Sequence, residues 1–284
     1  MGLDYHGLNF MRHARRSGDF GATVTIARQE VHLNELVVRR LLGNPANYHH
    51  QKYCDTLLRE HFGASSVDSI DMSSFEDATV LHDMNRPLPD DHAGRFDTVI
   101  DAGCLEHVYA INTALENCSR LVRPGGQILH VLPANNYCGH GFWQFSPELF
   151  FSLYSARNGY GETEVLVSDY LDHRYWYRVQ PPRDGKRVNI LSSSELYVMV
   201  RTVRLGEFSH VDVQQSDYAY EWATSVRDDS PVPTPSGLRG RIMRFSGIHE
   251  ALFSTYHRAR RIFSPDKLGP GHPGIERVQI SDMV

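Results

Sequence analysis

Three aspartates, Asp71, Asp83 and Asp101, each stand at the end of a short run rich in β-branched residues. In doubly wound α/β folds, a carboxylate at such a place can accept hydrogen bonds from both hydroxyls of a ribose. We therefore expect Asp71, with the adjacent Met72, to bind the ribose of a nucleoside. Asp83 can hydrogen-bond an adenine, and Met84 can cover it. The alternative is that Asp71 or Asp83 only forms a turn where its strand ends.

The segment after Asp101 contains two further candidate site residues, Gly103 and His107. Asp101 and His107 are candidate catalytic residues, because a carboxylate or an imidazole can position an acceptor or take up a proton. Asp101 and Gly103 also belong to the expected cofactor site. Two alternatives stay open: Asp101 caps the following helix, and His107 is a packed structural residue.

A long loop over residues 133–145 is dense in aromatic, amide and glycine residues. Loops at the carboxyl end of a strand shape substrate pockets. His140 is our first choice of general base, because imidazole titrates near neutral pH. The alternative is a surface histidine in a chain that holds sixteen. The expected substrate pocket consists of Tyr137, Phe142, Trp143 and Phe145. The aromatic block 172–178 either joins this wall or forms an edge strand.

These residues need a sheet to position them, and the hydrophobic pattern predicts one. Short β-branched runs alternate with amphipathic segments, which is typical of parallel βαβ units. The predicted strands are residues 22–27, 67–70, 79–82, 96–101, 127–132, 162–168 and 195–204.

Helices are predicted between the strands, at residues 32–42, 47–62 and 110–122, and from Ser146 to about residue 156. The last has a capping serine, a proline in its first turn and a glutamate that complements the helix dipole. We expect a helical segment over residues 1–20, a cofactor-binding domain over 21–205, and an extension over 206–284. The extension combines a linker at 228–240 with an amphipathic helix at 242–263.

Taken in order, the motifs resemble those of the class I S-adenosylmethionine-dependent methyltransferases, in their small-molecule branch. The resemblance covers about residues 21–204. It is carried by Asp71, by Asp83, by the run Leu105-Glu106-His107-Val108 after Phe96-Asp97, and by the turn Pro124-Gly125-Gly126. It implies a Rossmann-like α/β fold with a doubly wound, mostly parallel seven-stranded sheet. It also implies S-adenosylmethionine as cofactor across the carboxyl ends of the first strands, with the substrate above the fourth and fifth.

The first strand departs from the family pattern. Family members follow it with a glycine-rich loop that lets the backbone approach the cofactor. Here the segment contains Ala27, Arg28 and Gln29, and 43 residues separate Ala27 from Asp71, where about 20 are usual. The first helix is therefore extended by an insertion around residues 43–62. Either the loop is modified, with Arg28 or Gln29 contacting the cofactor carboxylate, or the site has lost the cofactor.

The expected reaction is methyl transfer to a hydroxyl, or less favourably an amine, of a small metabolite, natural product or sugar-like substrate. The rival hypothesis is a methyltransferase-like protein that has lost methyl transfer. It would act as a binding or scaffold subunit, or use the pocket for another reaction.

Composition further narrows the possible classes of protein and partner. The chain has 284 residues, a formal charge of −5 and four scattered cysteines, which argues against a disulfide scaffold or a zinc site. We expect no metal, no nucleic-acid partner, no membrane segment and a cytoplasmic location. From Leu238 onward, eight basic residues outnumber four acidic ones, so the extension is a candidate surface for homodimer formation.

Overall fold

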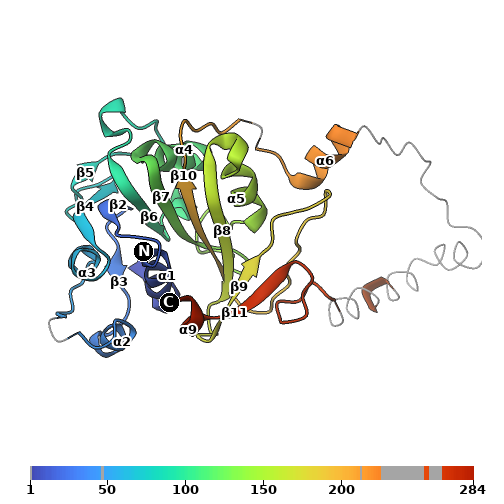
Figure 1. Cartoon of the computed structure of the whole chain (residues 1–284), viewed down its shortest axis with the longest axis horizontal. Coiled ribbons are helices and arrows are strands. Elements are labelled where there is room, and N and C mark those ends of the chain that lie inside the picture. Colours follow the sequence, from blue (N-terminus) through green and yellow to red (C-terminus); the bar gives the residue numbers. More distant parts are fainter. Residues whose placement is uncertain (1, 46–47, 212, 225–252, 256–263) are drawn as a thin grey trace, which may run out of the picture.

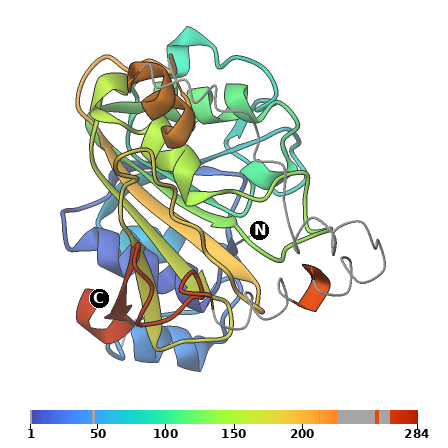
Figure 2. The ribbon, with the colours of Figure 1, turned by 90° about the vertical axis from the view of Figure 1, so that its right-hand side faces the viewer.

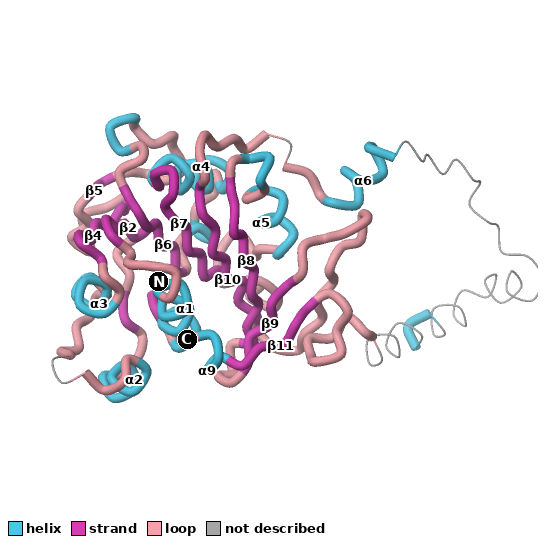
Figure 3. The backbone as a smooth tube through the Cα atoms, in the orientation of Figure 1, coloured by secondary structure: helices cyan, strands magenta, loops and turns pink. Residues whose placement is uncertain are grey.

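The computed structural model describes residues 2–45, 48–211, 213–224, 253–255 and 264–284. In this part of the chain, nine strands form one sheet, in the order β11-β9-β8-β10-β7-β6-β2-β4-β5. Helices lie on both faces of the sheet (Figures 1 and 3). The α/β class predicted from the sequence is confirmed.

One half of the sheet is parallel. It consists of β2 (Gly21–Ile26), β4 (Ala64–Asp71), β5 (Val80–Leu81), β6 (Phe96–Ala102) and β7 (Val122–Pro133). Each neighbouring pair runs in the same direction. The carboxyl ends of the five strands therefore meet at one edge, where doubly wound folds bind their ligands.

The other half is antiparallel. Strand β10 (Leu196–Arg204) lies between β7 and β8 (Tyr160–Asp169) and is antiparallel to both. Strands β9 (Tyr175–Val179) and β11 (Ile275–Gln279) continue the sheet beyond β8. The predicted sheet of seven mostly parallel strands was therefore wrong for the described residues, because nine strands form the sheet and half of its neighbouring pairs are antiparallel. Each of the seven predicted segments contains a strand, and β9 and β11 are the additions.

The strand β9 settles the two interpretations of the aromatic block 172–178. Its Trp176 is fully buried in the core, where its indole Nε1 donates to His6 Nδ1 over 3.1 Å. The block thus contributes a strand, and not a pocket wall. It does not lie at the edge of the sheet, because β11 pairs with it.

One face of the sheet is covered by α4 (Ile111–Leu121) and α5 (Pro147–Leu153). Ser146 caps α5, since its hydroxyl oxygen accepts from the amide of Glu148 at 3.3 Å. The serine, proline and glutamate therefore have the roles predicted for them. Shorter helical turns are η1 (Asp90–His92), η2 (Leu105–His107) and η3 (Ala156–Asn158).

The opposite face is covered by α1 (Tyr5–Arg15), α3 (Asp55–His61) and the C-terminal α9 (Ile280–Met283). His13 of α1 donates from Nδ1 to the carbonyl of Met283 over 2.9 Å. Figures 1 and 2 accordingly place α9 beside α1. Residues from the start of the chain and from its last ten positions thus pack on the same sheet.

The helix predicted over 47–62 is shorter than expected, because α3 begins at Asp55. The residues before it bond to the main chain near β3 (Glu30–Val31): Val31 donates to the carbonyl of Lys52 over 2.8 Å, and Cys54 donates to that of Gln29 over 2.9 Å. Backbone groups used in this way cannot join a helix. Strand β3 also pairs in parallel with β1 (Gly2–Leu3). Helix α2 (Glu35–Leu41) lies within the predicted 32–42.

Within the predicted extension 206–284, the structure describes α6 (Ser216–Thr224), β11 and α9. The predicted linker 228–240 lies outside the described residues. So does the predicted helix 242–263, except for residues 253–255, which are helical. The domain boundaries and homodimer formation through this extension stay predictions. Among the helices of the described ranges, none has the length and apolarity to span a membrane.

Candidate active site

A cavity of about 340 Å³ opens at the carboxyl edge of the sheet. It is lined by Ala102 at the end of β6 and by Val131 and Pro133 at the end of β7. Its walls include Gly2, close to the N-terminus marked in Figure 1, and Tyr197 of β10. Its titratable side chains include Glu106, His107 and His140.

The turn η2 presents Glu106 to this cavity, and Asp101 holds the turn in place. One oxygen of Asp101 accepts from the amides of Cys104 at 3.1 Å and Leu105 at 3.3 Å. Its other oxygen bonds to Nδ1 of His130 at 2.9 Å. Both side chains are fully buried. This geometry fits the capping alternative for Asp101, and not contact with a substrate.

His130 had no signal in the sequence beyond its place in a strand. The parallel register pairs it with Asp101 across β6 and β7. Its second nitrogen, Nε2, bonds to the hydroxyl of Tyr154 at 2.7 Å. A buried series of hydrogen bonds, from Tyr154 through His130 to Asp101, thus holds the turn in place.

The loop that follows β7 closes on the same turn. The carbonyl of Glu106 accepts from the amides of Phe142 at 2.8 Å and Trp143 at 3.3 Å. This approach requires Gly141, because a Cβ there would stand 2.8 Å from that carbonyl oxygen. The docked loop carries His140, so its imidazole lies 5.4 Å from that of His107, between ring centroids.

The carboxyl group of Glu106 is fully buried. Neither of its oxygens has a hydrogen bond from any described residue. Two imidazole nitrogens lie close to Oε1, His140 Nε2 at 3.4 Å and His107 Nε2 at 3.7 Å. Burial first, and then the nearby charge of Asp101, raise the pKa of Glu106 to about 8. Glu106 therefore holds a proton near neutral pH.

The two histidines are more open, with exposed side-chain fractions of 44% for His107 and 50% for His140. Partial burial, and then the positive charge of a protonated His140, lower the pKa of His107. Near neutral pH, His107 is therefore an uncharged imidazole that can accept a proton. Both predicted catalytic histidines thus reach one cavity. Glu106 was missed as a candidate, although its place in the Leu105–Val108 run was a signal.

The first loop takes an unusual course. Ala27, buried, adopts a left-handed conformation with φ of 56°, where family members place glycine. Arg28 is held by Asp55 at 3.5 Å and lies over the ring of Tyr53 at 4.1 Å. Gln29 is fully buried and donates to the carbonyl of Ile26. Neither Arg28 nor Gln29 lines the cavity.

On the expected nucleoside side, Asp71 ends β4 as predicted, and its carboxylate accepts from the amide of Ser73 at 3.0 Å. The adjacent Met72 is 72% exposed. Among the predicted cofactor residues, Gly103 lines the cavity. Its φ of 82° is one that favours glycine, and a Cβ there would meet Glu106 Oε1 at 3.3 Å.

Asp83 behaves as a turn residue. It accepts from the amide and the side chain of Asn85 at 2.9 and 2.8 Å, and these bonds lower its pKa. Met84 is buried in the core, where it contacts Asn117. This geometry supports the turn alternative for Asp83 and leaves Met84 unavailable as a cover for a base.

The four aromatic residues that were predicted to form the substrate pocket lie in different environments. Tyr137 stays near the cavity, stacked on Tyr197 with centroids 5.4 Å apart. Phe142 is 69% exposed. Trp143 donates from Nε1 to the carbonyl of Val108 over 2.8 Å. Phe145 is part of the hydrophobic core.

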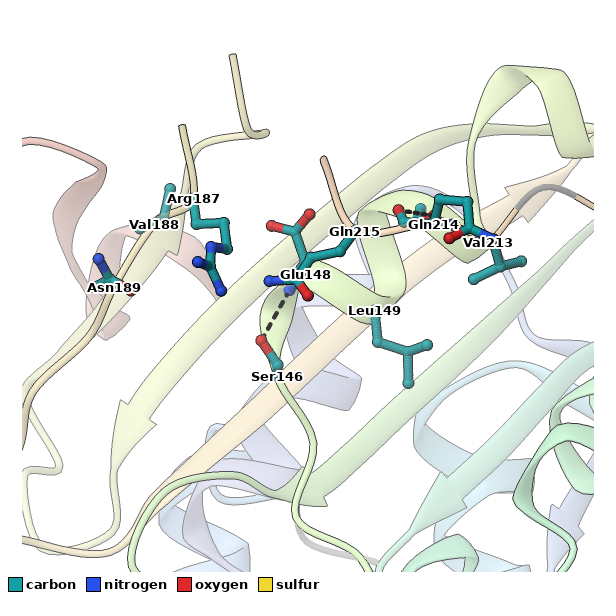
Figure 4. Close-up of a pocket in the computed structure, with 10 residues that line it drawn as sticks. Ser146, Glu148, Leu149, Arg187, Val188, Asn189, Val213, Gln214 and Gln215 are labelled. Atoms are coloured by element: carbon teal, nitrogen blue, oxygen red, sulfur yellow. Dashed lines mark hydrogen bonds between the residues drawn. The ribbon is translucent and has the colours of Figure 1, made fainter. Parts of the chain in front are cut away.

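A second cavity, of about 400 Å³, lies beside the start of α5 (Figure 4). Its charged groups are engaged in holding the chain together. Glu148 accepts from the amide of Ser216 at 2.7 Å, and Arg187 pairs with Asp217 at 2.9 Å. The cavity at the carboxyl edge, with its unpaired buried acid, is therefore the stronger candidate.

Comparison with known proteins finds one family match. Residues 49–130 match the family described as "Methyltransferase domain". This match covers less than a third of the chain, and it agrees with the resemblance to the class I S-adenosylmethionine-dependent methyltransferases, a class whose cofactor is S-adenosylmethionine. The matched segment contains Asp71 and the Leu105–Val108 run.

One curated relative is prosolanapyrone synthase of Alternaria solani, 25% identical over 154 residues, which are 47% of this chain. The chain matches only 6% of that protein's length.

Solved structures with a similar arrangement include the citrinin polyketide synthase CMeT domain, at 11% identity and a TM-score of 0.37. That alignment covers 67% of this chain and 47% of the other. Another is 1,6-didemethyltoxoflavin-N1-methyltransferase of Burkholderia thailandensis, at 15% identity and a TM-score of 0.37, covering 72% and 78%.

Proposed function

We propose that this protein transfers the methyl group of S-adenosylmethionine to a hydroxyl of a small molecule. The observation that carries the proposal is the meeting of Glu106, His107 and His140 in one cavity at the carboxyl ends of β6 and β7. The cavity volume of about 340 Å³ suits a small acceptor better than a polymer.

The reaction is an in-line displacement. The acceptor oxygen bonds to the methyl carbon while the carbon–sulfur bond breaks, and S-adenosylhomocysteine leaves as the neutral thioether. The hydroxyl proton passes to an imidazole of the cluster. The sulfonium is already activated, so the protein needs mainly to align the partners, exclude water and accept that proton.

His140 is the proposed proton acceptor, since it lines the cavity and half of its side chain is exposed. Glu106 lies 3.4 Å from its Nε2, so the carboxyl can orient the ring. His107 is the neighbouring imidazole that can replace it. Asp101 supports the turn and takes no part in proton transfer.

The cofactor is proposed to extend from Asp71, at the end of β4, toward Gly103 after β6. These strands flank β2, so the space between their ends is where the family places the donor. The names of the similar proteins include a polyketide synthase domain and a nitrogen methyltransferase. They support a small acceptor, with an amine as the second choice after a hydroxyl.

The second candidate function is a fold that has lost methyl transfer and binds a partner or another ligand. The first loop favours it. Ala27 replaces the usual glycine, and Arg28 and Gln29 are engaged in structural contacts, which leaves the cofactor carboxylate without the partners expected from the sequence.

Calorimetric titration with S-adenosylmethionine and S-adenosylhomocysteine separates the two functions. We expect both ligands to bind the folded protein, and Asp71→Ala to weaken binding by about 1 to 3 kcal/mol, the cost of unpaired ribose hydroxyls. Asp91→Ala is the matched control, because it removes the same charge from η1, before the amino end of β6. Absence of heat at high micromolar ligand would favour the second function.

The proton acceptor is tested separately. His140→Ala is expected to lower methyl transfer from labelled S-adenosylmethionine to a panel of small phenols, hydroxy acids and amines, with cofactor affinity unchanged. Full activity in that variant would assign the proton to His107.

A further inference from the structure

The geometry points to a divalent transition-metal site formed by Glu106, His107 and His140. Each residue offers one ligand atom, and the three atoms lie within 4.8 Å of one another. Two imidazole nitrogens and one carboxylate oxygen form a donor set that suits zinc, iron(II), manganese, cobalt or nickel.

The distances fit a shared ion. Ligand atoms about 2.1 Å from a tetrahedral ion stand about 3.4 Å apart. Glu106 Oε1 is 3.4 Å from His140 Nε2 and 3.7 Å from His107 Nε2. The two imidazoles are about half exposed, so small rotations can bring both nitrogens onto one ion.

The buried carboxyl supplies an independent reason. Glu106 has no exposed surface, and no described residue donates a hydrogen bond to either of its oxygens. Burying a polar group without a partner is costly. A cation between the carboxylate and the two imidazoles removes this cost, since it replaces the missing donors with a charge.

The site is held by elements that do not depend on the metal. Asp101 fixes the turn that carries Glu106 and His107, and the amide of Phe142 fixes the loop that carries His140. Because these hydrogen bonds order the turn and the loop before a metal binds, they favour a single geometry of the three ligands. Three protein ligands also leave a position open, as in catalytic metal sites.

If the protein transfers methyl groups as proposed, the open position on the metal would bind the acceptor hydroxyl. This role of the metal rests on the proposed function. Coordination to a divalent ion lowers the pKa of a bound hydroxyl. The metal would then promote loss of the hydroxyl proton to solvent at the mouth of the cavity, and the His140 imidazole would accept that proton only in the metal-free protein.

The test measures binding, with no readout of methyl transfer, so its result is independent of the proposed function. Chelator-treated, dialysed full-length protein is titrated with zinc chloride by calorimetry and with cobalt(II) by absorption spectroscopy. We expect one equivalent to bind. His140→Ala and His107→Ala, both at exposed positions, are each expected to weaken zinc affinity at least about tenfold.

Two controls make the assignment specific. His92→Ala removes an imidazole from η1, before the amino end of β6, so it should leave the affinity unchanged. Cys138→Ser tests the exposed thiol in the same loop as His140; the cobalt spectrum should lack a thiolate charge-transfer band. Thermal unfolding confirms that every variant is folded.

Stoichiometric binding that both histidine variants weaken, and His92→Ala does not, supports the site. The inference is overturned if no equivalent binds, if the histidine variants bind as well as the parent, or if only Cys138→Ser weakens binding.

Discussion

Replacing Glu106 by glutamine should remove a specific pH dependence of stability. The Glu106 carboxyl is fully buried, and its pKa is raised from 4.5 to about 8. Between these two values, the folded chain holds a proton that the unfolded chain has lost. Stability from this group is therefore fully present below pH 4.5, falls as pH rises through the window, and stays low above pH 8.

The magnitude follows from the same shift. Each unit of pKa is worth about 1.36 kcal/mol, so ionising Glu106 costs the folded state about 5 kcal/mol across the whole window. Glutamine has the same shape and no charge, so the stability of the variant should lack this pH-dependent cost.

The assay is urea denaturation of the parent and of Glu106→Gln at a series of pH values from 4.5 to 9, with a chelator present. Relative to the parent, the variant should gain stability steadily as pH rises, by several kcal/mol in total. Asp91→Asn, at an exposed carboxylate, is the matched control and should give a constant difference. A constant difference for Glu106→Gln as well would refute the reasoning, because it would mean that the carboxyl titrates alike in both states.

Three further changes test the scaffold by urea denaturation. Asp101→Ala leaves His130 without its buried partner at 2.9 Å and should cost about 3 to 5 kcal/mol; a loss below about 1 kcal/mol would contradict the anchoring role. Ser146→Ala removes the cap of α5 and should cost about 0.5 to 2 kcal/mol, whereas Ser146→Asp should retain it. Gly159→Ala places a Cβ 2.1 Å from the carbonyl oxygen of Glu207 at a φ of 88°, so it should cost at least about 1 kcal/mol; unchanged stability would mean that the 207 segment moves freely.

Several sheet elements follow from local sequence patterns. Alternating β-branched runs specify β2, β4, β6 and β7, because strand and helix preferences act over a few residues. Ser146 and the proline after it specify the start of α5 in the same way. Asp71 could be placed at a strand end for this reason. The strand β11 could not be predicted, because a short run near the chain end becomes a strand only through pairing with β9.

The candidate site was decided in part by the sequence and in part by packing. The sequence singled out His107 and His140 as residue types suited to proton transfer, and it placed both after predicted strands. Only the tertiary structure brought them to one cavity, because Gly141 lets its loop dock on the carbonyl of Glu106. Burial then left that glutamate without a hydrogen-bond donor among the described residues. Desolvation of this kind depends on neighbours distant in sequence, so no local pattern could reveal it.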